Sequence, residues 1–204
     1  MRAFSYALPL SLGLLAAAVA PVSAQAPAPA PAAATAPAFD TYNVVASDSK
    51  IGYLVVHPLH KVNGQSKAVA GRARLSAAGQ AQVMLTAGIE SFDSGNANRD
   101  AHVKEVLEAA RYPKVEIKAL ADGLTPPASF PATVDKTFKV QVSFHGVSQT
   151  LEVPVKVTFE SAARIRAACS FQLSLEAFKV ERPSLMFKKV DDALKIDADV
   201  VFGK

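Results

Sequence analysis

The amino-acid sequence predicts a mainly β, antiparallel fold of about eight strands with one α-helix. Two patterns predict it. Along most of the chain after the N-terminal region, apolar residues recur at every second position, which is typical of strands with one buried face. Over about residues 97–111 the apolar spacing changes to three and four, which is typical of one helix face. A β-sandwich and a closed barrel both fit this combination.

The N-terminal region is predicted to lie outside the fold. Arg2 is followed by an uncharged run that ends in Val22-Ser23-Ala24, small residues at the positions that a signal peptidase reads. We expect residues 1–24 to be a cleaved secretory signal peptide, with an uncleaved membrane anchor as the alternative. Residues 25–38 are almost only Ala and Pro, a composition that cannot bury a core, so they are expected to form a disordered spacer. One folded domain then covers residues 39–204.

Three strands are expected before the helix, at residues 51–57, 71–75 and 81–89. Glycines supply the turns between them at Gly64 and Gly79. These segments alternate apolar and polar residues, so each should bury one face.

The predicted helix has recognisable ends. Asn96 or Asn98 can accept a hydrogen bond from the first free backbone amides, and Asp100 adds negative charge where the helix dipole favours it. Pro113 disfavours helical geometry at the residue before it. The apolar face of this helix consists of Val103, Val106, Leu107 and Ala110. Because such a face must be buried against something, we expect the helix to close one end of the strand structure.

The clearest strand pattern follows the helix and a strand at residues 115–119. A proline-rich segment, residues 122–131, is predicted to be an exposed loop, and residues 137–159 then form a hairpin with one apolar face. Strands at residues 165–175 and 194–202 complete the pattern. Interior positions of the hairpin and of the next strand are candidate ligand-binding residues: Phe138, Val140, Val142, Phe144, Val153, Val155, Val157, Phe171 and Leu173.

Composition argues against several classes of function. The net charge of +4 comes from charges of alternating sign, without the basic cluster and interspersed aromatics of a nucleic-acid groove. The single cysteine, Cys169, lies on an alternating apolar face, which favours burial over reactivity. Neither a nucleophile elbow nor a phosphate-binding glycine loop occurs. The pair His57 and His60 suggests a metal site only weakly, because such a site needs three or four converging ligands. We therefore expect no enzyme, no metal and no cofactor.

Three segments resemble the YceI-like, polyisoprenoid-binding protein family. Residues 92–102 read Phe-Asp-Ser-Gly-Asn-Ala-Asn-Arg-Asp-Ala-His and, with Tyr112-Pro113, are similar to the family's Thr-Gly-Asn, Arg-Asp-x-His and Tyr-Pro segments. Residues 142–151 resemble its Leu-x-Gly-Val-Thr hairpin, and residues 178–184 its Phe-Gly-Ile-x-Arg-Pro loop. The chain departs from the family at two points. Asp48 stands where a histidine is common, and Lys179 stands where a glycine is usual.

The resemblance implies a lipocalin-like antiparallel barrel in the periplasm that encloses a long apolar ligand, a polyisoprenoid or isoprenoid quinone, for carriage or storage. Burying about ten methylenes at ~0.8 kcal/mol each is of order 8 kcal/mol, the scale of micromolar binding, so no special residue is required. The alternative is a periplasmic interaction module, with a barrel filled by its own side chains, that engages a membrane or redox partner. A metal-dependent enzyme using His57 and His60 ranks last. The expected partners are a long-chain isoprenoid lipid and, transiently, a membrane, with no nucleic acid.

Overall fold

The computed structural model describes residues 38–185 and 187–204. The predicted signal peptide and nearly all of the predicted spacer lie outside these residues. The described residues form twelve strands, one α-helix and two short 3-10 helices. In chain order they are β1 (Phe39–Val44), η1 (Ala46–Asp48), β2 (Lys50–His57), β3 (His60–Ser66), β4 (Val69–Ser76), β5 (Ala81–Gly88), η2 (Ile89–Ser91), α1 (Ala97–Val106), β6 (Lys114–Ala121), β7 (Ala132–Phe144), β8 (Val147–Ser161), β9 (Arg164–Ser174), β10 (Ser184–Leu185), β11 (Lys188–Lys189) and β12 (Ala193–Gly203).

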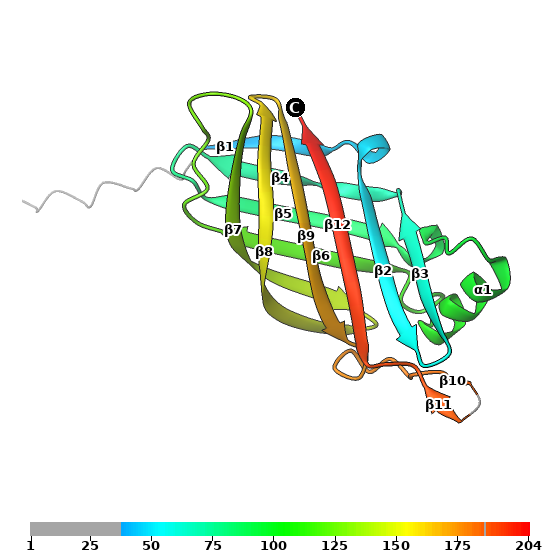
Figure 1. The fold of residues 1–204 in the computed structure, drawn as a ribbon. Helices are drawn as coiled ribbons and strands as arrows, with labels where there is room; N and C mark the ends of the chain where they lie inside the picture. Colours follow the sequence, from blue (N-terminus) through cyan, green and yellow to red (C-terminus); the bar gives the residue numbers. More distant parts are fainter. Residues whose placement is uncertain (1–37, 186) are drawn as a thin grey trace, which may run out of the picture. The chain divides into compact units, whose positions relative to one another are not determined.

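Ten of these strands form one antiparallel sheet that closes on itself (Figure 1). The order is β1-β4-β5-β6-β7-β8-β9-β12-β2-β3. Strand β1 also pairs with β12, Asn43 opposite Gly203 and Val44 opposite Phe202, so eight strands complete a barrel. The predicted antiparallel barrel of about eight strands with one helix is therefore confirmed.

Strand β12 is shared by β1 at one end of the barrel and by β2 at the other. After β1 the chain passes through η1 into β2, which pairs with β12, and Lys50 lies opposite Asp199 there. Ser49 fixes this crossing, because its hydroxyl donates to the carbonyl of Val45 at 2.8 Å and accepts from the amide of Val201 at 3.0 Å. The hairpin of β2 and β3 therefore extends the wall beyond the eight-stranded barrel.

The interior of the barrel is packed solid at the end where β1 meets β12. Alternate side chains of every strand point inward, as the sequence pattern predicts. The packed end is filled by large buried side chains, among them Tyr42, Phe138, Val157, Phe159, Ile165 and Phe202. The predicted exposed loop at residues 122–131 runs over this end, but its Leu124 is buried and its amide bonds the carbonyl of Gly79 at 2.8 Å.

Helix α1 begins as predicted and ends earlier than predicted. Asn96 is the N-cap, and its side chain accepts a hydrogen bond from the amide of Arg99 at 3.1 Å. The helix ends at Val106, whereas the sequence pattern extends to residue 111. Glu108 has φ of 46°, in the left-handed region, and this breaks the helical path before Pro113 is reached. Residues 107–112 form a turn that leads into β6.

Candidate ligand-binding cavity

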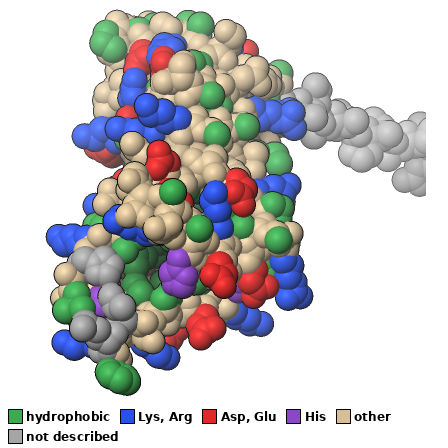
Figure 2. Space-filling model, turned by 90° about the vertical axis from the view of Figure 1, so that its right-hand side faces the viewer, with side chains coloured by type: hydrophobic (Ala, Val, Ile, Leu, Met, Phe, Trp, Pro, Cys, Tyr) green, Lys and Arg blue, Asp and Glu red, His purple; other side chains and the backbone are tan. Residues whose placement is uncertain are grey.

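A cavity of about 360 Å³ occupies the barrel end opposite the packed end. This volume lies in the range of small-molecule pockets, which is roughly 300–1,000 Å³. Its walls are the inward faces of β2, β5, β6, β7, β9 and β12, together with α1 and the segment of residues 175–190. Figure 2 shows a hollow in the surface beside a histidine, with hydrophobic side chains inside it. We call this half of the barrel the hollow end.

The strands supply the apolar wall of the cavity. Val142 and Phe144 of β7 line the cavity together with Phe171 and Leu173 of β9, and Ile117 of β6 is the register partner of Val142. All of these positions share the inward parity of their strands. Because apolar side chains continue around the wall, the cavity suits a hydrocarbon and offers few partners for a polar solute.

The apolar side chains of Val103 and Val106 in α1, and of Leu107 at its C-cap, belong to the cavity wall. The expectation that this helix covers one end of the barrel is therefore confirmed for these residues. Ala110 was predicted on the same face but is exposed, and Ala109 is buried in its place. The shift by one residue follows from the end of the helix at Val106.

Polar side chains in the cavity lining come from several elements, among them Tyr53 and His57 of β2, Arg99 and His102 of α1, and Glu181 after β9. Arg99 lines the cavity, is partly buried, and forms no ion pair with any residue in the described ranges. The phenol of Tyr53 lines it too, and its pKa is raised by burial and by the nearby Asp100 carboxylate, an effect that Arg99 opposes. Asp100 is held by the amide of Ser94, at 3.1 Å. One side of an otherwise apolar cavity therefore carries a cation and a phenol.

His57 borders the cavity, and its hydrogen bonds are those of a neutral imidazole. Its Nδ1 accepts from the amide of Leu59 at 3.2 Å, so Nε2 carries the proton and donates to the carbonyl of Lys188 at 3.0 Å. The side chain of His60 is not among those described. Among the described residues, no group of three or more His, Cys, Asp or Glu side chains is arranged to hold a metal ion. The ring of His57 instead links the β2–β3 turn to β11.

The nine residues predicted to bind a ligand all point into the barrel, but they divide into two sets. Val142, Phe144, Phe171 and Leu173 line the cavity. The other five are buried in the core without lining it: Phe138, Val140, Val153, Val155 and Val157. The inward parity is confirmed, and contact of any of the nine with a ligand stays a prediction.

Several cavity residues were not predicted from the sequence. Tyr53 and Val55 lie on a strand that was predicted, but the pattern gave no reason to prefer this strand over the 137–159 hairpin. Val180 comes from a loop, where no periodicity marks an inward position, whereas Leu175 ends the strand predicted at residues 165–175 but was not named as a candidate. Arg99 lies within the Arg-Asp-x-His segment of the family resemblance, but no contact with a ligand was predicted for it. That it has no acidic partner among the described residues is visible only in three dimensions.

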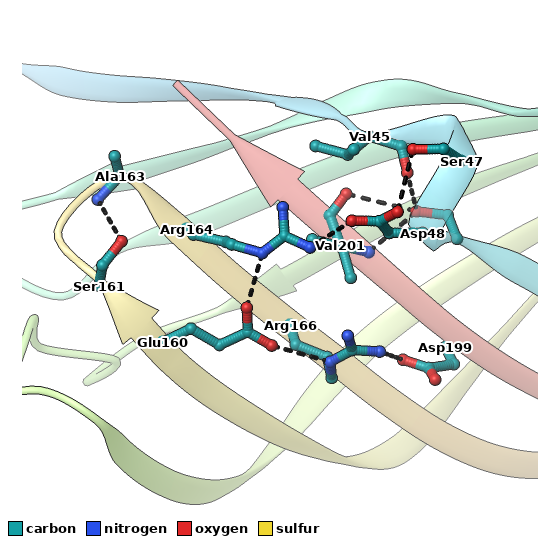
Figure 3. Close-up of polar contacts among 11 residues, drawn as sticks. Val45, Ser47, Asp48, Glu160, Ser161, Ala163, Arg164, Arg166, Asp199 and Val201 are labelled. Atoms are coloured by element: carbon teal, nitrogen blue, oxygen red, sulfur yellow. Dashed lines mark hydrogen bonds and ion pairs between the residues drawn. The ribbon is translucent and has the colours of Figure 1, made fainter.

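Two other groups of chemical interest have structural explanations. Burial raises the pKa of the Cys169 thiol to about 11, so the reactive thiolate is disfavoured. Outside the barrel, Arg164 pairs with Asp48 and Glu160, and Arg166 pairs with Glu160 and Asp199 (Figure 3). These partly exposed ion pairs connect η1, β8, β9 and β12. Asp48, at the position where the resembled family has a histidine, therefore lies in this network and does not line the cavity.

No helix within the described part of the chain is both long and apolar enough to span a membrane. A search of curated proteins found no match. Three similar solved structures show the same fold. A polyisoprenoid binding domain from Saccharophagus degradans matches with a TM-score of 0.65 and 16% identity, covering 79% of this chain and 97% of that one.

The other two are more distant in fold or in sequence. Burkholderia cenocepacia BcnA has a TM-score of 0.59 at 21% identity, with 78% of this chain and 98% of that one covered. The YCEI protein of Campylobacter jejuni has a TM-score of 0.54 at 14% identity, with 70% and 85% covered. The family profile of the YceI-like domain matches residues 42–202, nearly all of the barrel. The chain described here belongs to the YceI-like family.

Proposed function

We propose that the protein is an exported, periplasmic carrier or store of an isoprenoid lipid, such as a polyisoprenoid or isoprenoid quinone, which it holds in the hollow end of the barrel. The observation that carries this proposal is the cavity of about 360 Å³ with an almost entirely apolar wall. Apolar surface leaves water at a gain of about 25 cal/mol per Å², so such a wall favours a hydrocarbon ligand. The family membership and the polyisoprenoid binding domain among the similar structures support the same class of ligand.

A binding role is favoured over catalysis by the chemistry of the cavity wall. Few polar side chains line the cavity, and both ring nitrogens of His57 are hydrogen-bonded to backbone groups. An interaction module with a filled barrel remains the second candidate, because the packed end is in fact filled by side chains. The two candidates differ in what the hollow end contains when the protein is isolated from its own periplasm.

Arg99 and Tyr53 suggest that the ligand carries a polar head group. A guanidinium that lines an apolar cavity and has no acidic partner among the described residues can donate hydrogen bonds to oxygen atoms of a ligand. A quinone carbonyl or a phosphate offers such acceptors, whereas a plain hydrocarbon does not. We expect Arg99→Met to weaken binding of a polyprenyl phosphate by roughly tenfold, the scale of one charge-assisted hydrogen bond, and to leave binding of a hydrocarbon of equal length nearly unchanged.

Two substitutions of the same kind test the location of the ligand. Val55 lines the cavity, and Val55→Phe should fill space there, reducing uptake of a long-chain isoprenoid quinone at least about tenfold with little change in melting temperature. Val153 is fully buried and does not line the cavity. Val153→Phe should therefore overpack the core and lower the free energy of unfolding by about 1–3 kcal/mol, while the folded protein still binds the quinone. Native mass spectrometry and thermal unfolding measure both effects. Quinone binding by Val55→Phe at the parent level would place the ligand elsewhere.

Native mass spectrometry of protein from its own periplasm separates the candidate functions. A bound isoprenoid lipid is the expected result, whereas an empty protein favours the interaction module and stoichiometric zinc favours the enzyme. N-terminal sequencing of the same sample tests export, because cleavage after Ala24 leaves a chain that begins at Gln25.

A further inference from the structure

Two hairpin tips at the hollow end expose large hydrophobic side chains. Phe187, in the turn between β10 and β11, is 106% exposed, and Leu59, in the turn between β2 and β3, is 54% exposed. Exposed single hydrophobic residues are common, but two at neighbouring turn tips indicate a surface that contacts something apolar. The amide of Leu59 is held by Nδ1 of His57 at 3.2 Å, and Phe187 follows the short strand β10, which pairs with β11.

The two tips are fastened to each other. His57 Nε2 donates to the carbonyl of Lys188 at 3.0 Å, and the amide of Asp191 donates to the carbonyl of Val56 at 2.8 Å. These two bonds therefore tie β11 and the residues just after it to the end of β2. In Figure 1 the β10–β11 hairpin lies beyond the turn of β2 and β3, at the end of the barrel away from the C-terminus. We call residues 57–62, 183–185 and 187–190 together the double tip.

The double tip carries positive charge only. It contains Lys61, Lys188 and Lys189 and no acidic residue. None of these lysines forms an ion pair with another residue in the ranges that the structure describes. The nearest acidic residues along the chain, Glu181 and Asp191, flank the hairpin and do not belong to its tip. Unpaired lysines beside an exposed aromatic ring match a surface with negative head groups above an apolar layer.

The double tip also borders the entrance to the cavity. His57, Val62, Pro183, Ser184 and Val190 belong to it and line the cavity. Any surface that receives Phe187 and Leu59 therefore lies beside the opening through which a lipid passes. This juxtaposition favours a bilayer over a soluble partner, because the bilayer is also the source or destination of the proposed ligand.

From the exposed Phe187 and Leu59, the three lysines and the adjacent cavity, we infer that the double tip docks on the surface of a membrane that contains anionic lipids. Phe187 and Leu59 enter the interface, and the lysines contact the head groups. The docking surface goes beyond the proposed function, since a carrier can bind lipid without touching a bilayer.

The experiment uses the full chain, which contains no tryptophan, so one introduced tryptophan is the only indole signal. Phe187→Trp places it at the tip, and Phe130→Trp places it in the β6–β7 loop at the packed end, where Phe130 is 41% exposed. With vesicles of phosphatidylcholine and phosphatidylglycerol, the emission of the indole at 187 should shift to shorter wavelength and be quenched by brominated lipid. The indole at 130 should do neither.

Charge is tested in the Phe187→Trp background. Lys188→Gln with Lys189→Gln should raise the lipid concentration at half-maximal shift roughly 10- to 30-fold, and added salt should do the same to the parent because it screens the lysines. Lys139→Gln with Lys156→Gln, on the outer barrel wall, should leave the midpoint unchanged.

Three results would overturn the inference: no shift at 187, an equal shift at 130, or a shift that does not depend on phosphatidylglycerol. A shift at 187 that requires a second protein and not lipid would identify the double tip as a protein interface. Uptake of an isoprenoid quinone is measured separately on the same variants. Docking without uptake contradicts the proposed function alone, and uptake without docking contradicts this inference alone.

Discussion

Nε2 of His145 lies 3.6 Å from Oε1 of Glu108, so the turn between β7 and β8 meets the turn that follows α1. The imidazole is only 8% exposed, packs at a tilt of 57° against the ring of Tyr112 with centroids 4.8 Å apart, and has its Nδ1 3.1 Å from the carbonyl oxygen of Phe178. Gly146 permits this approach, because a Cβ there would lie 2.7 Å from the Tyr112 ring. Three loops at the hollow end therefore converge on one histidine.

Removal of this imidazole should destabilise the protein. His145→Ala loses a buried hydrogen bond and an aromatic contact, each worth about 1 kcal/mol, so the free energy of unfolding should fall by about 1–3 kcal/mol. Because Glu108 is half-exposed, Glu108→Gln should change the free energy of unfolding by less than about 0.5 kcal/mol. Urea unfolding measures both. A larger loss for Glu108→Gln than for His145→Ala would show that the ion pair, and not the packing, holds the loops together.

Replacement of Lys179 by glycine should stabilise the folded protein. Its φ is 57°, in the left-handed region, and its side chain is exposed. A side chain with a Cβ destabilises the folded protein by about 1–2 kcal/mol in that region. Glycine removes this strain, but its greater freedom in the unfolded chain offsets about 0.5–1 kcal/mol of the gain. Lys179→Gly should therefore raise the free energy of unfolding by up to about 1 kcal/mol.

The matched control for this change is Lys139→Gly, at an exposed position in the extended strand β7. There the glycine relieves no strain and should cost about 0.5–1 kcal/mol. Thermal unfolding compares the two variants. If both lowered the melting temperature equally, the left-handed backbone at residue 179 would not be a source of strain.

The ion-pair network outside the packed end should make stability depend on acid pH. Hydrogen bonds from Arg166 and then Arg164 hold the pKa of Glu160 below its ordinary value of 4.5. A carboxyl with a depressed folded-state pKa contributes stability above its unfolded-state pKa and loses that contribution as the pH falls through the folded-state value. Parent protein should therefore melt higher than Glu160→Gln at neutral pH, and the difference should shrink below about pH 4.5.

Salt provides the control for this pH effect. Because the ion pairs are partly exposed, about 1 M salt should also reduce the difference between Glu160 and its glutamine variant at neutral pH. Both effects are checked by the melting temperatures of the parent and the Glu160→Gln variant, measured over a series of pH values and a series of salt concentrations. A difference that stays constant from neutral to strongly acid pH would mean that the charge on Glu160 contributes nothing to folding.

The strands that alternate strictly could be predicted from the sequence. In β7 and β8, Phe138 to Phe144 and Val153 to Phe159 alternate without interruption, so parity alone gave the buried face. Strand β3 was missed because its sequence, His-Lys-Val-Asn-Gly-Gln-Ser, is nearly all polar, and its place is fixed by pairing with β2. Local patterns do not encode a strand whose stability comes from a neighbour.

The division of the barrel into a packed and a hollow end could not be predicted from the sequence. Val142 and Val140 are identical in residue type and parity, yet only Val142 lines the cavity. The difference arises from what stands across the barrel, namely large side chains at the packed end and a wall widened by β2, β3 and α1 at the hollow end. Such long-range placement depends on the closure of the sheet. Period-two patterns do not contain that information.

The inward face of β8 can be tested with one new residue at two adjacent positions. Val155 is 8% exposed and points into the core, whereas Lys156 is exposed on the outer wall, opposite Asp135 of β7. Val155→Gln buries an amide without a built partner and should lower the free energy of unfolding by about 2–4 kcal/mol. Lys156→Gln removes only an exposed charge whose register partner is Asp135, and should change the free energy of unfolding by less than about 0.5 kcal/mol.

Ligand uptake separates stability from binding in the same pair of variants. Val155 does not line the cavity, so whatever fraction of Val155→Gln remains folded should still take up an isoprenoid quinone in the normal ratio. Urea unfolding and native mass spectrometry supply the two measurements. If Val155→Gln were as stable as the parent while Lys156→Gln unfolded, the apolar face of β8 would have to point outward, because a one-residue change of register moves every side chain of a strand to the opposite face.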